Sequence, residues 1–214
     1  MLTLRRPLLA GLLIGSLLGI ATTANATSIE TVTTPFTGTD TAVRVVLSEE
    51  GGDIRVTATV TLGIADLRGV YLDIGNDALL DDMTASGEFV TSYQFDANGV
   101  INLGHGSNLR GGGTPCPCDI GVELGTPGIG KDDILSTSFL LHSSSPLSLA
   151  DFAEQLVGVR VTSVGPDPDR RGGSAKLAGT LPDAVPVPEP TPGLLTAAGL
   201  GALSYYASRR QRRR

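Results

Sequence analysis

The strictest constraint on the fold is an alternation of apolar and polar side chains along residues 54–62. The apolar members stand at every second position, as Ile54, Val56, Ala58, Val60 and Leu62, with Arg or Thr between them. A period of two places all five on one face of an extended strand. The segment is therefore predicted to be a strand that is buried on one side, and the rest of the chain has to supply the partners of that strand.

The first partner precedes this strand. Val43, Val45 and Leu47 repeat the alternation, and Glu50-Gly51-Gly52-Asp53 separates the two runs. Two glycines between alternating runs are typical of a tight hairpin, because glycine adopts positive φ without steric cost. A β-hairpin is therefore predicted here.

More strands are expected downstream. The candidate stretches are Gly69–Ile74, Phe89–Phe95, Leu135–Leu141, Val157–Val164 and the apolar stretch Lys176–Leu181. Ser148 and Asp151 have the spacing of a capping box, which predicts a short helix over Leu149–Gln155. Short strands separated by Gly, Asp and Asn turns favour a mostly β domain. We expect an antiparallel, jelly-roll-like β-sandwich with one short helix.

The N-terminus has the pattern of an export signal. Arg5 and Arg6 precede an apolar run, Leu8–Ile20, and Ala24 and Ala26 form an A-x-A cleavage site. This predicts a signal peptide over residues 1–26 and a mature chain that lies outside the cytoplasm. The alternative is a signal segment that is retained as a membrane helix.

The C-terminus has the pattern of a membrane anchor. Residues 191–208 carry no charge and, as a helix, would span about 27 Å at ~1.5 Å per residue, close to a bilayer core. A transmembrane helix is therefore predicted. Five arginines follow it and are expected to hold the end of the chain in the cytoplasm: Arg209, Arg210, Arg212, Arg213 and Arg214.

A short motif precedes this predicted helix: Val187, Pro188, Glu189 and Pro190. Its prolines favour an extended backbone. Motif, apolar span and arginine cluster together resemble the PEP-CTERM sorting signal. The resemblance implies an exosortase as partner, processing near the motif, delivery to the cell surface or the extracellular matrix, and an association with exopolysaccharide. It assigns no activity to the ectodomain. An ordinary single-pass anchor with a proline-rich stalk is the alternative.

These segments predict a domain organisation in five parts. They are a signal peptide (1–26), a β-sandwich ectodomain (27–181), a proline-rich stalk with the motif (182–190), a transmembrane helix (191–208) and an arginine-rich cytoplasmic tail (209–214). The protein is expected first as an inner-membrane-anchored precursor and then at the cell surface or outside the cell.

The ectodomain is strongly acidic. Between Thr27 and Pro186, nine Lys or Arg residues stand against twenty-one Asp or Glu residues, a formal net charge of −12. With no basic stripe in the sequence, nucleic acid is not expected as a partner. Calcium is the one candidate cofactor, because it takes carboxylate and carbonyl oxygens at turns. Asp73, Asp77 and Asp81 are the candidate ligands, and solvated loop carboxylates are the alternative.

Cys116 and Cys118 are the only cysteines. An even number in an exported protein indicates a disulfide. One intervening residue makes an unstrained bridge difficult, so a crosslink between chains is an alternative. A transient metal site with His105 and Asp119 is a second alternative.

Signals for catalysis are weak. His105 and His142 have neither a G-x-S-x-G nor an HExxH context. Gly125–Lys131 matches a phosphate-binding pattern, but Asp132 stands where Ser or Thr is required, so a glycine-rich turn is expected. Tyr71 and Tyr93 are the candidate tyrosine platforms for sugar stacking.

The sequence thus predicts a protein that is not an enzyme, with a structural or adhesive role in the envelope or matrix. A calcium-dependent carbohydrate-binding module is the alternative, and a secreted hydrolase is a third class.

Overall fold

The computed structural model describes residues 28–113, 117–126, 133–168 and 171–184. All of them belong to one compact unit, Asn25–Pro186. This unit is mostly β and its strand pairs are antiparallel, as the sequence predicts. The expected signal peptide, sorting motif, transmembrane helix and arginine tail lie outside the described residues.

The regular structure consists of short strands and two 3-10 helices. In chain order they are β1 (Ser28–Gly38), β2 (Ala42–Glu50), β3 (Asp53–Leu62), β4 (Ile64–Leu72), η1 (Asp77–Leu79), β5 (Thr84–Gly87), β6 (Val90–Val100), β7 (Asn102–Gly104), β8 (Ser107–Asn108), β9 (Cys118–Leu124), β10 (Ser136–His142), η2 (Leu149–Asp151), β11 (Leu156–Gly165) and β12 (Gly173–Thr180).

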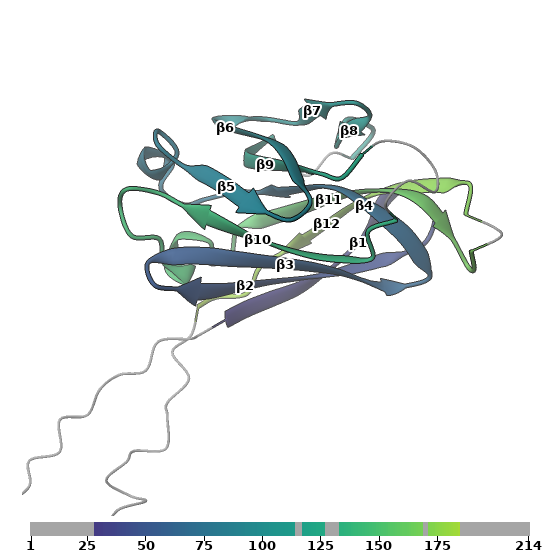
Figure 1. The fold of residues 1–214 in the computed structure, drawn as a ribbon, viewed down its shortest axis with the longest axis horizontal. Coiled ribbons are helices and arrows are strands. Elements are labelled where there is room, and N and C mark those ends of the chain that lie inside the picture. Colours follow the sequence, from purple (N-terminus) through teal and green to yellow (C-terminus); the bar gives the residue numbers. More distant parts are fainter. Residues whose placement is uncertain (1–27, 114–116, 127–132, 169–170, 185–214) are drawn as a thin grey trace, which may run out of the picture. The chain divides into compact units, whose positions relative to one another are not determined.

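Ten of these strands follow one another in a single hydrogen-bonded order, β5-β10-β3-β2-β1-β12-β11-β4-β9-β6. The order curls back on itself, and the two end strands, β5 and β6, are consecutive in the chain and lie near each other (Figure 1). The result is a near-barrel. We call β5, β10, β3 and β2 the β2 half, and β12, β11, β4, β9 and β6 the β11 half.

Strand β1 joins the two halves. Its residues 28–33 pair with β2, and its residues 34–38 pair with β12. The change of partner coincides with a register shift between Pro35 and Thr37. Proline lacks a backbone N–H and is tolerated in a sheet at such irregular positions. The Pro35 segment therefore marks the place where the chain leaves one half for the other.

The predicted hairpin is confirmed. β2 ends at Glu50 and β3 begins at Asp53, and these two residues are paired. Gly51 and Gly52 form the two-residue loop with φ of 66° and 97°, the left-handed backbone that such a loop requires. The alternation on β3 is real as far as Ala58, whereas Leu62 is 49% exposed.

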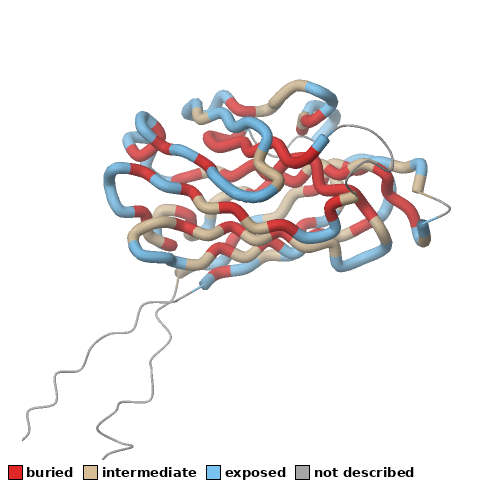
Figure 2. Tube along the Cα trace, viewed as in Figure 1, coloured by how far each residue is buried: buried red, intermediate tan, exposed pale blue. Residues whose placement is uncertain are grey.

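The core lies between the halves. Val45 and Phe139 of the β2 half share one buried cluster with Leu67, Val122 and Val159 of the β11 half. Buried positions alternate along β3 and β10, but β9 is buried throughout (Figure 2). Both faces of β9 are thus covered, one by the core and the other by the segment described next.

A flap formed by residues 101–109, which contain β7 and β8, packs on the outer face of the β11 half. It contributes Leu109 to a second buried cluster with Tyr71, Val100 and Cys118. Three glycines lie beneath the flap and provide the space that it needs. A Cβ atom on Gly69, Gly121 or Gly158 would lie closer than 3.0 Å to atoms of the flap or of Val100.

Two expectations need correction. The helix expected over Leu149–Gln155 is the 3-10 helix η2, although its capping box of Ser148 and Asp151 is present. The sequence also did not reveal β1 or β9. β1 is rich in threonine and contains Pro35, and the uniform burial of β9 removes the period of two.

Candidate functional site

One row of side chains crosses the outer face of the β11 half. The strand registers place one residue of each strand in it: from β6 to β1 it reads Ser92, Glu123, Gly69, Arg160, Lys176 and Thr37. Directly opposite residues have Cβ atoms about 4.5–5.5 Å apart. The row therefore holds two cations, Arg160 and Lys176, side by side.

Two cavities meet at these cations. The first has a volume of about 310 Å³ and reaches from His105 and Gly106 of the flap to Arg171 and Ser174. The second has a volume of about 240 Å³ and is lined by Thr37, Gly38 and Lys176 among others. Arg160 and Ser174 line both cavities. We call the joined cavities the outer-face groove.

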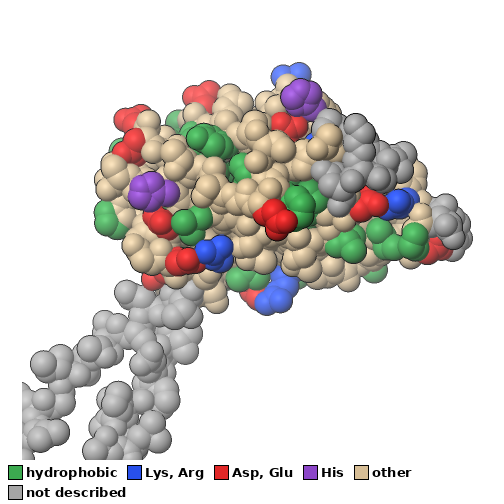
Figure 3. Space-filling view, in the orientation of Figure 1, with side chains coloured by type: hydrophobic (Ala, Val, Ile, Leu, Met, Phe, Trp, Pro, Cys, Tyr) green, Lys and Arg blue, Asp and Glu red, His purple; other side chains and the backbone are tan. Residues whose placement is uncertain are grey.

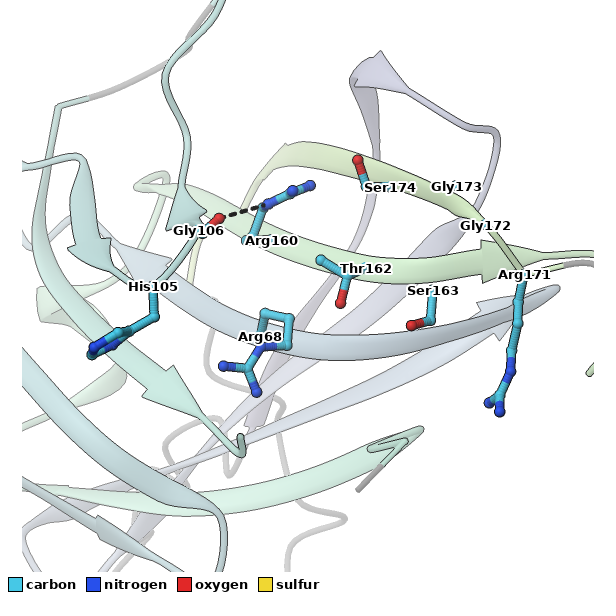
Figure 4. Close-up of a pocket in the computed structure, with 10 residues that line it drawn as sticks. All are labelled: Arg68, His105, Gly106, Arg160, Thr162, Ser163, Arg171, Gly172, Gly173 and Ser174. Atoms are coloured by element: carbon cyan, nitrogen blue, oxygen red, sulfur yellow. Dashed lines mark hydrogen bonds between the residues drawn. The ribbon is translucent and has the colours of Figure 1, made fainter. Parts of the chain in front are cut away.

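The Arg160 side chain donates its described hydrogen bonds to backbone carbonyls. Its Nε donates to the Gly106 carbonyl at 3.2 Å, and its Nη1 donates to those of Val161 and Ala175 at 2.9 and 3.0 Å. Figure 4 shows the side chain extending toward Ser174. Partial burial lowers the pKa of Arg160.

Like Arg160, the Lys176 side chain is hydrogen-bonded to a backbone carbonyl and has a lowered pKa. Its Nζ donates to the carbonyl of Arg110. Burial and then the charge of Arg160 lower the pKa of Lys176. Within the described part of the chain, neither Lys176 nor Arg160 forms an ion pair with a carboxylate. Like charges directly opposite each other destabilise a sheet, so this pair is an electrostatic cost to the fold.

A buried ion pair lies on the flap side of the groove. Arg68 Nη2 is 3.8 Å from Glu123 Oε1, and both side chains are almost fully buried. Ser92 donates to Glu123 Oε2 at 2.8 Å, and His105 Nδ1 lies 3.3 Å from Oε1. Arg68 is the extra residue of an irregular pairing between β4 and β11, where Gly69 pairs with Arg160 and Leu67 with Val161.

Two lining residues of the first cavity have buried polar atoms without a hydrogen-bond partner among the described residues. They are Arg68, through Nη1 and Nη2, and Ser163, through Oγ. Ser163 also has a φ of 52° and lies at the second irregularity between β11 and β4. Irregularities of this kind are frequent beside binding sites, where they redirect side chains.

The groove changes the interpretation of the charge. Seven Lys or Arg residues lie in the described part of the chain, and four of them, Arg68, Arg160, Arg171 and Lys176, line the groove. Arg44 and Arg55 are on the β2 half, paired with Glu30 and Glu50. The face in Figure 3 shows acidic and basic side chains spread among uncharged ones, some of them next to each other. The structure therefore brings together in one groove four cations that are separated in the sequence.

The candidate calcium ligands lie elsewhere. Asp73 contacts Asp119, a buried residue that accepts the backbone N–H groups of Ile74 and Asn98 at 2.9 and 2.6 Å. Burial, the hydrogen bond with Asp119, and the charges of Asp119 and Asp77 raise the pKa of Asp73 to about 7. Asp77 and Asp81 are exposed. No group of three or more His, Cys, Asp or Glu side chains in the described residues is arranged to hold a metal ion.

His142, one of the two histidines considered for catalysis, and its neighbour Ser143 each contact a carboxylate. His142 Nδ1 lies 2.6 Å from Asp53 Oδ1, and Ser143 donates to Asp82 at 2.8 Å. The glycine-rich stretch after Gly125 leads into strand β10, and its residues 127–132 lie outside the described residues.

The two tyrosines considered as sugar platforms differ in exposure. Tyr71 is fully buried, and burial raises its pKa to about 12. It cannot stack on a sugar. Tyr93 is 46% exposed on β6, and its ring centroid lies 5.2 Å from that of Phe95.

Cys118 is fully buried and is not a free thiol. Its predicted partner Cys116 lies outside the described residues, as do the cleavage-site residues Ala24 and Ala26.

Comparisons with known proteins add no family. The chain matches no family model, no curated protein and no solved structure. Among the residues that the structure describes, no helix has the length and apolar character to cross a bilayer.

Glu123→Gln is expected to destabilise the domain by about 3–5 kcal/mol, because it leaves the charge of Arg68 buried without a partner. Denaturant unfolding measures this. The matched control is Glu30→Gln, which breaks the exposed pair with Arg44 and should cost less than about 1 kcal/mol. Equal losses in the two variants would contradict a buried ion pair.

Asp73→Asn is expected to stabilise the domain above pH 7 and to have little effect near pH 4. An acid whose pKa rises on folding, here from 3.8 to about 7, keeps its proton longer in the folded state, so stability falls as the pH rises between these values and is then constant. Thermal unfolding at both pH values measures the difference. The exposed Asp81→Asn is the control, and a pH-independent effect of Asp73→Asn would rule the raised pKa out.

Proposed function

We propose that this chain is an exported envelope or matrix protein with a structural or adhesive role, sorted by a PEP-CTERM-like signal. The observation that carries the adhesive part is the outer-face groove, because it is an open surface site with two cations, Arg160 and Lys176, that form no ion pair among the described residues. In this proposal the near-barrel is a flattened, jelly-roll-like sandwich that displays the groove. Its ligand would be a polymer of the matrix, with exopolysaccharide as the candidate.

The non-enzymatic part of the proposal has separate support. His142 and the neighbouring Ser143, the nearest serine in the chain, each lie against a different carboxylate, Asp53 and Asp82. A nucleophile and its base have to lie within hydrogen-bond reach of each other. The sorting part depends on the motif Val187–Pro190, on residues 191–208 and on the arginine tail, with an exosortase as partner.

Sorting is tested with Glu189→Ala in a host that has an exosortase. The variant is expected to accumulate as a full-size membrane precursor, whereas the natural chain is shortened and leaves the membrane. Fractionation and immunoblotting with a tag in the ectodomain measure both species. Glu88→Ala, an exposed glutamate of the described domain, is the matched control. Normal shortening in a strain that lacks the exosortase would defeat the proposal.

A second candidate function is calcium-dependent carbohydrate binding. It is favoured by Asp73, whose pKa is raised by burial, by its hydrogen bond with Asp119 and by the repelling charges of Asp119 and Asp77. A divalent cation would relieve this repulsion, and backbone carbonyls can complete its coordination. Tyr93, on the exposed edge strand β6, would supply the sugar platform.

Calcium binding predicts a higher melting temperature in millimolar calcium than in chelator at pH 8. The increase should disappear in Asp73→Asn and persist in Asp81→Asn. An unchanged melting temperature of the natural chain would remove this second candidate.

A further inference from the structure

The outer-face groove has a specific chemical character: an excess of positive charge on an acidic domain. Its two central cations, Arg160 and Lys176, are directly opposite each other on β11 and β12. Their described hydrogen bonds go to carbonyl oxygens, which carry no formal negative charge. An anion between them would remove the repulsion that burial strengthens.

The groove also has neutral donors at the right places. The Thr37 and Ser174 side chains line the cavity around Lys176, and Thr162 and Ser174 line the cavity around Arg171. Hydroxyl groups can both donate and accept hydrogen bonds. Cations interleaved with hydroxyls suit a ligand that has both anionic and hydroxyl groups.

The flap shapes one wall of the groove. Gly104, His105 and Gly106 have φ of 92°, 46° and 84°, and this left-handed turn presents the Gly106 carbonyl to Arg160. Gly69 below the turn leaves room for Ser107, whose Oγ donates to the Arg68 carbonyl at 3.0 Å. The Arg160 side chain is thus held in one orientation, so that it loses less conformational entropy when a ligand binds.

We propose that the outer-face groove binds the oxyanion groups of an acidic polysaccharide. Arg160 and Lys176 would hold one carboxylate or sulfate group, and Arg171, at the far end of the first cavity, would approach the next anionic group along the chain. Arg171 donates to Asp133 at 2.5 Å, so its contribution to binding is smaller than that of the unpaired cations.

An acidic saccharide fits this groove better than a nucleic acid. Nucleic acids without duplex structure bind largely through stacking on aromatic rings, and His105 is the only aromatic side chain among the described lining residues of the groove. That the saccharide is a matrix component rests on the proposed function; the affinity of the groove for acidic sugars does not.

The test uses the full chain purified in detergent and two pairs of probes, at fixed ionic strength. The first pair is a galacturonate oligomer and its methyl ester, and the second pair is dextran sulfate and dextran. The proposal expects binding of one or both acidic members and at least about tenfold weaker binding of the neutral member. The preferred acidic member identifies carboxylate or sulfate as the ligand group. Added NaCl should weaken this binding.

Arg160→Gln and Lys176→Gln are each expected to weaken the binding of the acidic probe by about tenfold, because each variant loses one charge-assisted hydrogen bond. Arg44→Gln, which removes a cation on the β2 half, is the matched control and should leave the affinity unchanged. If Arg160→Gln does not fold, Lys176→Gln decides, because the Lys176 side chain has only one described bond.

Three results would overturn the proposal: equal affinity for acidic and neutral probes, unchanged affinity in Lys176→Gln, or tighter binding of a single-stranded oligonucleotide than of either acidic saccharide. Failure here is distinct from failure of the proposed function. A chain that binds acidic saccharide but is not sorted refutes only the sorting, and a chain that is sorted but does not bind refutes only the groove.

Discussion

The structure depends on β1, which is hydrogen-bonded to both halves of the near-barrel. Its first residues extend the β2 half and its last residues extend the β11 half. Strands that change sheet through an irregularity make the corners of such folds. Because one buried cluster draws side chains from both halves, the corner at Pro35 determines how the halves face each other and therefore whether the core closes.

The same corner also determines where one end of the groove lies. Thr37, just past the irregularity, ends the row of side chains that contains Lys176 and Arg160. The row exists only because five antiparallel pairings have a particular register. A shift of one residue would turn these side chains toward the core. For this reason the sequence alone could not show that residues 37, 69, 123, 160 and 176 lie together.

The predictable parts of the fold are those with a local cause. The alternation up to Ala58 and the glycine pair 51–52 identify the β2–β3 hairpin, because both act within a dozen residues. β9 could not be predicted in this way. The flap covers its second face, so this strand has no regular alternation of buried and exposed positions. The charge count likewise contains no information on where the charges lie. A net value of −12 describes the whole domain, whereas four cations collect on one face through the pairing of β4, β11 and β12.

The position of β12 has a mechanical consequence. β12 lies between β1 and β11 and is hydrogen-bonded to both, it begins at the groove, and it ends at Thr180, on the side of the chain that leads to the C-terminus. A ligand held at Arg160 on β11 and a chain held beyond Leu181 would pull β11 and β12 past each other along their lengths. Hydrogen bonds of an antiparallel pair are perpendicular to the strands. They would therefore resist the force together in shear instead of opening one after another, which is the arrangement that an adhesive domain under tension requires.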